Sequence, residues 1–197
     1  LNETDETIVI EISEVSNGTE LGTQRQTVPI INDDPIPTVT LSVGSERINE
    51  NGNSGTSTTT VTATLSALSG QNVTVTLTTN GSATRITDYT LSGNTIFIPA
   101  GTLSADPLLS AISDKMDEED ETVDLKITCD IGSNCTVGTV SQKTVAIIDD
   151  DPPPTVTLSV GSLGINESAP GNSTTVTAEL STISSRKITV TLAKNGV

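Results

Sequence analysis

Apolar and polar residues alternate with a period of two along most of this chain. In TVTLSV, the residues Val39, Leu41 and Val43 fall on one face, and the same alternation recurs in VTATLS (61–66) and VTVTL (73–77). Strict alternation of this kind is typical of a half-buried β-strand. Similar patterns mark further expected strands at 95–98, near 103–112, at 122–127 and at 138–148.

Turns rich in Gly and Asn separate these segments, and none of the segments shows the period of a helix. About seven alternating strands within about 115 residues indicate an all-β fold, an antiparallel β-sandwich. The prolines fall at expected strand entries or between expected domains, where a missing N–H does not interrupt a hydrogen-bond ladder.

Several long segments of the sequence occur twice, at an offset of 115 to 117 residues. PTVTLSVGS begins at Pro37 and again at Pro154, and DETIVIEI (5–12) matches DETVDLKI (120–127). The differences in length are confined to loops rich in Gly, Asn and Ser. We therefore interpret the chain as tandem copies of one structural unit.

The offset divides the chain into three parts. We expect the end of one repeat in residues 1–35, a complete repeat in 36–152 and the start of a further repeat in 153–197. Neither partial repeat contains a counterpart of residues 83–115. We expect the chain to come from a longer array, and its terminal parts to be poorly stable unless a neighbouring chain completes them.

Charge and hydropathy narrow the possible partners. The net charge is −16 with nine basic residues, so no basic patch is present to neutralise phosphates, and nucleic acid is excluded as a partner. No apolar run approaches the roughly 18 residues of a membrane span, so we expect no membrane insertion in this segment. The acidic excess fits a soluble surface protein or a cation binder.

The composition also argues against catalysis. The chain has no His, no Ser/His/Asp or Cys/His arrangement and no phosphate-binding Gly-rich loop, so we expect no enzyme. A carboxylate pair could serve a glycosidase, but here such acids are expected to be occupied by an ion. Phe97 and Tyr89 are the only aromatic residues, which is too few for a sugar-binding platform.

Two further features concern covalent modification. Cys129 and Cys135 are the only cysteines, and their spacing suits a disulfide that closes a small hairpin loop, worth about 2 kcal/mol by loop entropy; two free thiols are the alternative. Sequons for N-glycosylation provide possible acceptors. They occur at Asn2, Asn17, Asn72, Asn80, Asn134, Asn166 and Asn172.

The acidic residues of the complete repeat gather in a few loops, at Glu50, Asp88, 114–121 and 149–151. Loops at alternate connections of a sandwich share one end, so these segments can converge. Converging carboxylates repel unless a cation joins them, and oxygen ligands from several loops suit Ca²⁺ better than Mg²⁺. The alternative is that these acids are solvated turn residues and charges that protect a sheet edge.

The order of these motifs resembles the Calx-β repeat family. The segments that carry the resemblance are INE (48–50), TDY (87–89), DEEDETVDLKI (117–127) and AIIDDD (146–151). The resemblance implies an immunoglobulin-like sandwich, a fold found in regulatory loops of sodium/calcium exchangers, in integrin β4 and in long extracellular adhesins and matrix proteins. In family members that bind calcium, the ions lie in loops at the tip that adjoins the next domain.

Carried over by position, the resemblance implies a set of calcium ligands. In the complete repeat they are Glu50, Asp88, Asp114, the backbone carbonyl of Met116, Glu118, Asp149, Asp150 and Asp151; in the partial repeats they are Glu3, Asp33, Asp34 and Glu167. Lys115 stands within the acidic run and can pair with a carboxylate, so we expect fewer ions than the family maximum.

These observations predict a structural, extracellular or cell-surface segment. Calcium at 149–151 would clamp the junction that precedes Pro152–Pro154, so tandem repeats would form a stiff stalk, fibre or adhesin rod. Its partners would be neighbouring repeats and, in a filament, other protomers. Two alternatives are a regulatory Ca²⁺ sensor domain of a membrane transporter and a glycosylated fibre without ions.

Overall fold

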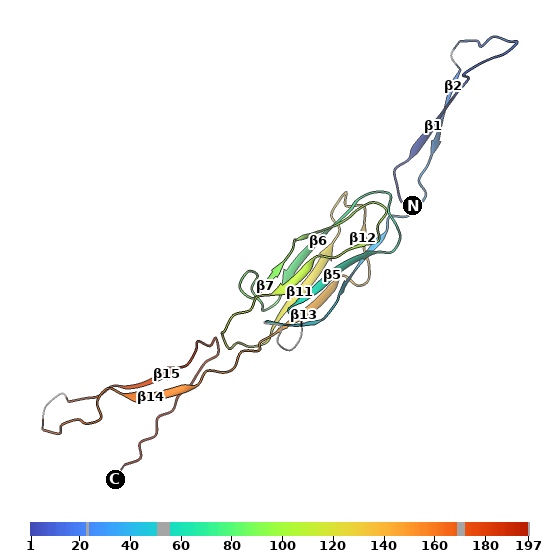
Figure 1. The fold of residues 1–197 in the computed structure, drawn as a ribbon. Helices are drawn as coiled ribbons and strands as arrows, with labels where there is room; N and C mark the ends of the chain where they lie inside the picture. The colour runs from blue at the N-terminus through green and yellow to red at the C-terminus, as the bar shows by residue number, and fades with distance from the viewer. Residues whose placement is uncertain (23, 51–55, 169–171, 197) are drawn as a thin grey trace.

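A computed structural model describes residues 1–22, 24–50, 56–168 and 172–196. A β-sandwich forms the middle of the chain, and a two-stranded hairpin extends from each of its ends (Figure 1). The sandwich corresponds to the expected complete repeat. Over the described residues, no helix has the length and hydrophobicity needed to cross a membrane.

The first sheet of the sandwich has the strand order β12-β3-β5-β10-β7, and β9 also pairs with β5. Its strands are β3 (Thr38–Val43), β5 (Thr58–Leu65), β7 (Tyr89–Leu91), β9 (Ser104–Ala105), β10 (Leu108–Ala111) and β12 (Thr136–Val137).

The second sheet has the strand order β4-β13-β11-β6-β8. Its strands are β4 (Arg47–Asn49), β6 (Val73–Asn80), β8 (Thr95–Ile98), β11 (Glu121–Thr128) and β13 (Gln142–Ile148).

The core lies between the two sheets and consists almost wholly of aliphatic side chains. The alternation seen in the sequence sets which residues enter it: Val61, Ala63 and Leu65 of β5 are buried, whereas the intervening threonines are not. Tyr89 is buried with this cluster, and Phe97 is exposed. The all-β sandwich predicted from the sequence is therefore confirmed.

The details of the strands differ from the prediction. The complete repeat has more strands than the seven expected, because short strands such as β4 and β12 are too brief to show alternation. The expected strand at 138–148 begins only at Gln142, and the run near 103–112 is divided into β9 and β10. Two pairings are parallel rather than antiparallel, β12 with β3 and β13 with β4.

The predicted disulfide is confirmed. Cys129 and Cys135 are joined across a loop that follows β11, with their Cα atoms 5.8 Å apart. Both cysteines are half-buried and pack against the core, so the bridge anchors this loop to the sandwich.

The two terminal hairpins reproduce parts of the complete repeat in the same register. The N-terminal hairpin is β1 (Glu6–Glu11) paired with β2 (Arg25–Ile30), and the C-terminal hairpin is β14 (Val156–Val160) paired with β15 (Val176–Leu180). Ile8 lies opposite Val28 in the first hairpin, as Val123 lies opposite Val145 in the sandwich. The repeat seen in the sequence is thus a repeat of strand pairing.

Hydrogen bonds join each hairpin to the sandwich at equivalent positions. At the N-terminal junction the Gly70 amide donates to the Asn2 carbonyl at 2.7 Å, and Asn2 forms a β-bridge with Ser69. At the C-terminal junction the Ser185 amide donates to the Asp117 carbonyl at 3.1 Å, and Asp117 forms a bridge with Ser184. An offset of 115 residues relates the two sets of contacts.

Candidate metal centre

Strand pairing brings acidic residues together at one end of the sandwich. Glu50 follows β4 directly, and Asp149 follows β13 directly. Because β4 and β13 are parallel, with Ile148 opposite Asn49, both strands leave the sheet at the same end. The Glu50 amide donates to the Ile148 carbonyl at 3.2 Å, which fixes the first residue after β4. We call the resulting group of loops the acidic tip, consisting of Glu50, Asp88, 114–121 and 149–151.

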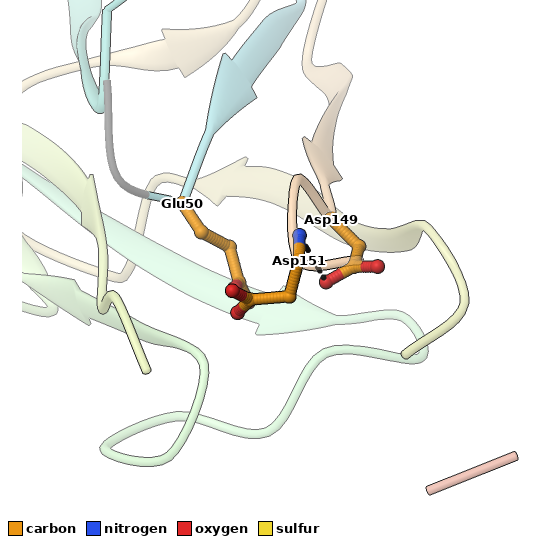
Figure 2. Close-up of side chains that lie close together, drawn as sticks. All are labelled: Glu50, Asp149 and Asp151. Atoms are coloured by element: carbon orange, nitrogen blue, oxygen red, sulfur yellow. Dashed lines mark hydrogen bonds between the residues drawn. The ribbon is translucent and has the colours of Figure 1, made fainter. Parts of the chain in front are cut away.

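The first cluster in the acidic tip contains Glu50, Asp149 and Asp151. One carboxylate oxygen from each residue lies within 4.8 Å of the other two. Figure 2 shows these side chains converging from the ends of the two strands, with the Asp151 amide donating to Asp149 Oδ1 at 3.4 Å. Glu50 is buried, and the two aspartates are half-buried.

Some of these oxygens lack a protein partner. Among the described residues, Glu50 Oε2, Asp150 Oδ1 and Asp151 Oδ2 are buried and accept no hydrogen bond. A buried carboxylate oxygen without a donor is costly, and a bound cation would relieve that cost.

A second cluster contains Asp88, Glu118 and Glu121, again with oxygens within 4.8 Å of one another. Asp88 precedes β7 and is held by a tight turn, in which the Thr84 amide donates to Asp88 Oδ2 at 2.5 Å. The Ile112 amide donates to the Asp88 carbonyl at 2.9 Å. Glu121 is the first residue of β11 and lies on its inward-facing register, so it points toward the cluster from the sheet itself.

The electrostatics of the acidic tip disfavour full ionisation. Burial, followed by the charges of Asp114 and Asp149, raises the pKa of Glu50 to about 7. Burial and then a hydrogen bond with Asp88 raise the pKa of Glu121 to about 7. These shifts have the sign expected for carboxylates that share a site without a counter-charge.

The same causes act on two neighbours. Burial raises the pKa of Glu118, and the charges of Asp114 and Asp88 add to the effect. Burial also raises the pKa of Asp151, with Asp149 adding to it and Lys115 opposing it. Asp149 of the first cluster also raises the pKa of Glu118, so the two clusters interact electrostatically.

The donor set fits calcium. Among the described residues, each of the two clusters brings together three carboxylate oxygens, and Ca²⁺ takes six to eight oxygen ligands with flexible geometry. Zinc and other transition metals favour nitrogen or sulfur ligands, and the chain has no His while both cysteines are in the disulfide.

The structure brings together five of the ligands expected in the complete repeat: Glu50, Asp88, Glu118, Asp149 and Asp151. The other three lie nearby without joining either cluster. Asp114 is exposed and its Oδ1 accepts from the Met116 amide at 2.7 Å, and Asp150 follows Asp149 with one oxygen buried. For all eight residues, a role as calcium ligands stays a prediction.

Sequence reasoning missed Glu121. The signal was present, because Glu121 occupies an inward position on a strand whose next inward residues, Val123 and Leu125, are buried. A carboxylate on an otherwise apolar strand face needs a partner at the sheet end. A search for charged residues at inward positions would have found it.

In the partial repeats, Glu3, Asp33 and Asp34 line one hollow beside the N-terminal hairpin, whereas Glu167 lies in the other partial repeat. Glu3, Asp33, Asp34 and Glu167 are all exposed, and within the described residues none belongs to a group of three converging carboxylates.

The sequons differ in how accessible their side-chain amides are. Asn2 is buried and its Nδ2 donates to the Asp34 carbonyl at 3.1 Å, while Asn134 Nδ2 donates to the Asn72 carbonyl at 3.0 Å. Burial makes the side-chain amide of Asn2 the least accessible of the seven. The remaining sequon asparagines are exposed: Asn17, Asn72, Asn80, Asn166 and Asn172.

Comparison with known proteins finds partial matches of low identity among solved structures. No family model matches the chain, and no curated protein matches it. Solved structures that resemble it include CBD12 from CALX1.2, with a TM-score of 0.46 and 20% identity over 57% of this chain and 45% of that one. Calcium binding domain CBD12 of CALX1.1 gives a TM-score of 0.45 and 22% identity over 53% of this chain and 41% of that one.

The Calx CBD1 domain in its apo form gives a TM-score of 0.44 and 21% identity over 58% of this chain and 99% of that one. The matched part of this chain covers less than half of each CBD12 structure and nearly all of the Calx CBD1 domain.

Proposed function

We propose that this chain is a calcium-binding structural segment of a repeat array, in which Ca²⁺ bound at the acidic tip fixes the junction with the following repeat. The observation that carries the proposal is the cluster of Glu50, Asp149 and Asp151, whose oxygens converge within 4.8 Å and include buried atoms without a donor. Solvated turn carboxylates would not leave such atoms buried.

The acidic tip is continuous with the C-terminal junction. Arg186 of the following repeat donates from Nε to the Glu118 carbonyl at 2.9 Å, and its guanidinium pairs with Glu119 at 3.1 Å. Ser184 Oγ donates to Asp117 Oδ2 at 2.7 Å. Because Glu118 belongs to the second carboxylate cluster, an ion there would hold the loop that the next repeat contacts.

The proposed role of the bound ions is mechanical rather than catalytic. Residues Glu50, Asp149 and Asp151 would hold one ion, and Asp88, Glu118 and Glu121 a second. The bound charge would remove carboxylate repulsion from the tip, so the loop 114–121 and the segment after β13 would keep one conformation. Tandem repeats would then form a stalk, fibre or adhesin rod, with no chemical step.

The disulfide supports an extracellular or cell-surface location, because disulfides persist in oxidising compartments. This favours a stalk over a cytosolic Ca²⁺ sensor domain of a transporter, which would keep Cys129 and Cys135 reduced. Glycans at exposed sequons would suit the same location. The partners of the segment would be neighbouring repeats.

The test is calorimetric titration of the full chain with Ca²⁺ and with Mg²⁺, together with thermal unfolding in Ca²⁺ and in chelator. We expect heat and a higher Tm with Ca²⁺, both reduced in an Asp149→Asn/Asp151→Asn variant. Asp106→Asn, which removes one exposed charge outside the acidic tip, is the control. Absence of heat and an unchanged Tm would overturn the calcium proposal and leave the ion-free fibre.

A further inference from the structure

A short turn in each repeat contacts the repeat that precedes it. We call this segment the docking turn, consisting of residues 67–71 in the complete repeat and residues 182–186 in the following repeat. In both docking turns the serine side chain accepts a hydrogen bond from the amide two positions later, at 3.0 Å in the first and 3.1 Å in the second. Since the β-bridges to the preceding repeat are also equivalent, the two junctions share their backbone contacts.

The side chains at these equivalent positions differ in charge. The residue that forms the bridge with the docking turn is Asn2 at the N-terminal junction and Asp117 at the C-terminal junction. The docking turn that each one receives ends in Gln71 in the first case and in Arg186 in the second. The positions that hold an acid and a base at one junction therefore hold two neutral amides at the other.

Asp117 is a buried acid whose side-chain partners come from the following repeat. It is 2% exposed. Ser184 Oγ donates to its Oδ2 at 2.7 Å, and Arg186 Nε lies 3.8 Å from its Oδ1. Over the described residues, no second basic side chain forms an ion pair with Asp117. Because a buried carboxylate without a cation is strongly destabilising, Asp117 fits a docking turn that ends in arginine.

The loop around Asp117 provides further acceptors for the arginine. Arg186 Nε donates to the Glu118 carbonyl at 2.9 Å, and its Nη2 lies 3.1 Å from Glu119 Oε2. At the N-terminal junction, the residue equivalent to Glu119 is Thr4. An arginine in place of Gln71 would therefore meet a hydroxyl and an amide where Arg186 meets two carboxylates.

Asn2 uses the one property that an aspartate lacks, which is a side-chain donor. Its Nδ2 donates to the Asp34 carbonyl at 3.1 Å. A carboxylate at this position would face that carbonyl oxygen without a proton to donate, and Gln71 would bring no positive charge to compensate. Asn2 therefore fits a docking turn that ends in a neutral residue.

We propose that this pair of side chains selects which repeat can follow which: an aspartate at the bridge position receives a docking turn that ends in arginine, and an asparagine receives one that ends in glutamine. A wrong neighbour is rejected because the mismatch leaves a charge desolvated and unpaired. The inference rests on the part of the proposed function that makes the chain a segment of a repeat array, and it requires no calcium.

The test is amide hydrogen exchange of the full chain, followed by NMR in chelator and again in Ca²⁺. The Ser185 amide, which donates to the Asp117 carbonyl at 3.1 Å, reports on the C-terminal junction. The Gly70 amide, in the equivalent hydrogen bond of 2.7 Å, reports on the N-terminal junction. The Ser181 amide, bonded at 2.9 Å within the C-terminal hairpin, reports whether that hairpin stays folded.

The variants exchange one junction's side chains for those of the other. Arg186→Gln should accelerate exchange at Ser185 by about tenfold or more, because Asp117 loses its cation. Asp117→Asn should accelerate it by less, because Glu119 still pairs with the arginine. The double variant Asp117→Asn/Arg186→Gln recreates the neutral pair and should restore exchange to within about threefold of the unmodified chain. Exchange at the Gly70 amide should not change in any of the three.

The reciprocal variants test the N-terminal junction. Asn2→Asp should accelerate exchange at Gly70, and Asn2→Asp/Gln71→Arg should slow it again. If Arg186→Gln also releases the Ser181 amide, the hairpin has unfolded and this second set decides. An unprotected Ser185 amide in the unmodified chain, single variants without effect, or a double variant no slower than its faster single variant would each overturn the proposal. Calorimetric titration with Ca²⁺ is independent of these rates, so either proposal can fail while the other stands.

Discussion

Replacing Glu50 by Gln should stabilise the calcium-free protein, whereas removing a buried charged group usually destabilises a fold. Glu50 is 6% exposed, and burial together with neighbouring carboxylates raises its pKa from 4.5 to about 7. At pH 8 without calcium, Glu50 is ionised, and the neighbouring carboxylates of Asp114 and Asp149 repel its charge. Glutamine keeps the volume, removes the charge and adds an NH₂ donor near oxygens that have no partner.

The size of the effect follows from the pKa. A rise from 4.5 to about 7 corresponds to at most about 3 kcal/mol, and screening by solvent at this surface tip reduces it to about 1–2 kcal/mol. We therefore expect Glu50→Gln to raise the free energy of unfolding in chelator by about 1–2 kcal/mol. Calcium at a hundredfold excess over Kd should stabilise the unmodified protein by about 2.7 kcal/mol, and should stabilise the variant less.

The assay is urea unfolding at pH 8, in chelator and in Ca²⁺. The order of stability should invert between the two conditions, with the variant more stable in chelator and the unmodified protein more stable in Ca²⁺. Asp106→Asn should change the free energy of unfolding by no more than about 0.5 kcal/mol in either condition. A variant that is less stable than the unmodified protein in chelator would refute the reasoning, because Glu50 would then have partners that the repulsion argument omits.

Three further predictions concern the sandwich. In chelator, the stability contributed by Glu50 and Glu121 should be fully present below pH 4.5 and lost as the pH rises through about 7, because folding raises the pKa of both carboxyl groups. Urea titrations at several pH values should show this loss in chelator but not in Ca²⁺, and any other result would contradict the prediction. Gly81→Ala should cost about 3 kcal/mol, because φ is +119° and the new Cβ would lie 2.2 Å from a backbone oxygen of β11. Gly101→Ala, at φ +76° with open space around it, should cost only about 1 kcal/mol, and equal losses would refute the steric argument. Reducing Cys129–Cys135 should lower the free energy of unfolding by about 2 kcal/mol, and a Tm unchanged by reductant would contradict it.

The sequence contained most of the information on strand faces and little on strand neighbours. Val61, Ala63 and Leu65 alternate with threonines along the sequence, which predicts that the three apolar side chains point inward, and the structure confirms it. Which strands lie side by side depends on contacts across the sheet, which a single strand does not encode. The parallel pairing of β4 with β13 was beyond reach for this reason, since three residues of β4 show no periodicity.

The candidate metal centre was predictable in part for the same reasons. Glu50 and Asp149 could be placed at strand ends, and the order of motifs indicated that their loops converge. The division into two clusters was not predictable, because it depends on side-chain directions after the parallel pair and on Glu121 at the start of β11. Glu3 and Glu167, by contrast, are exposed, and among the described residues neither belongs to a group of three converging carboxylates.

The equivalence of the two junctions has a geometric consequence for a long array. Asn2 with Ser69 and Asp117 with Ser184 form the same bridge, one repeat apart. If every junction in an array repeats this bridge, one rotation and one translation relate each repeat to the next, and the array is a screw whose pitch a single junction determines. A change of a few degrees at each junction then accumulates with the number of repeats. A small change in the geometry of the bridge therefore alters the shape of a long array more than that of a short one.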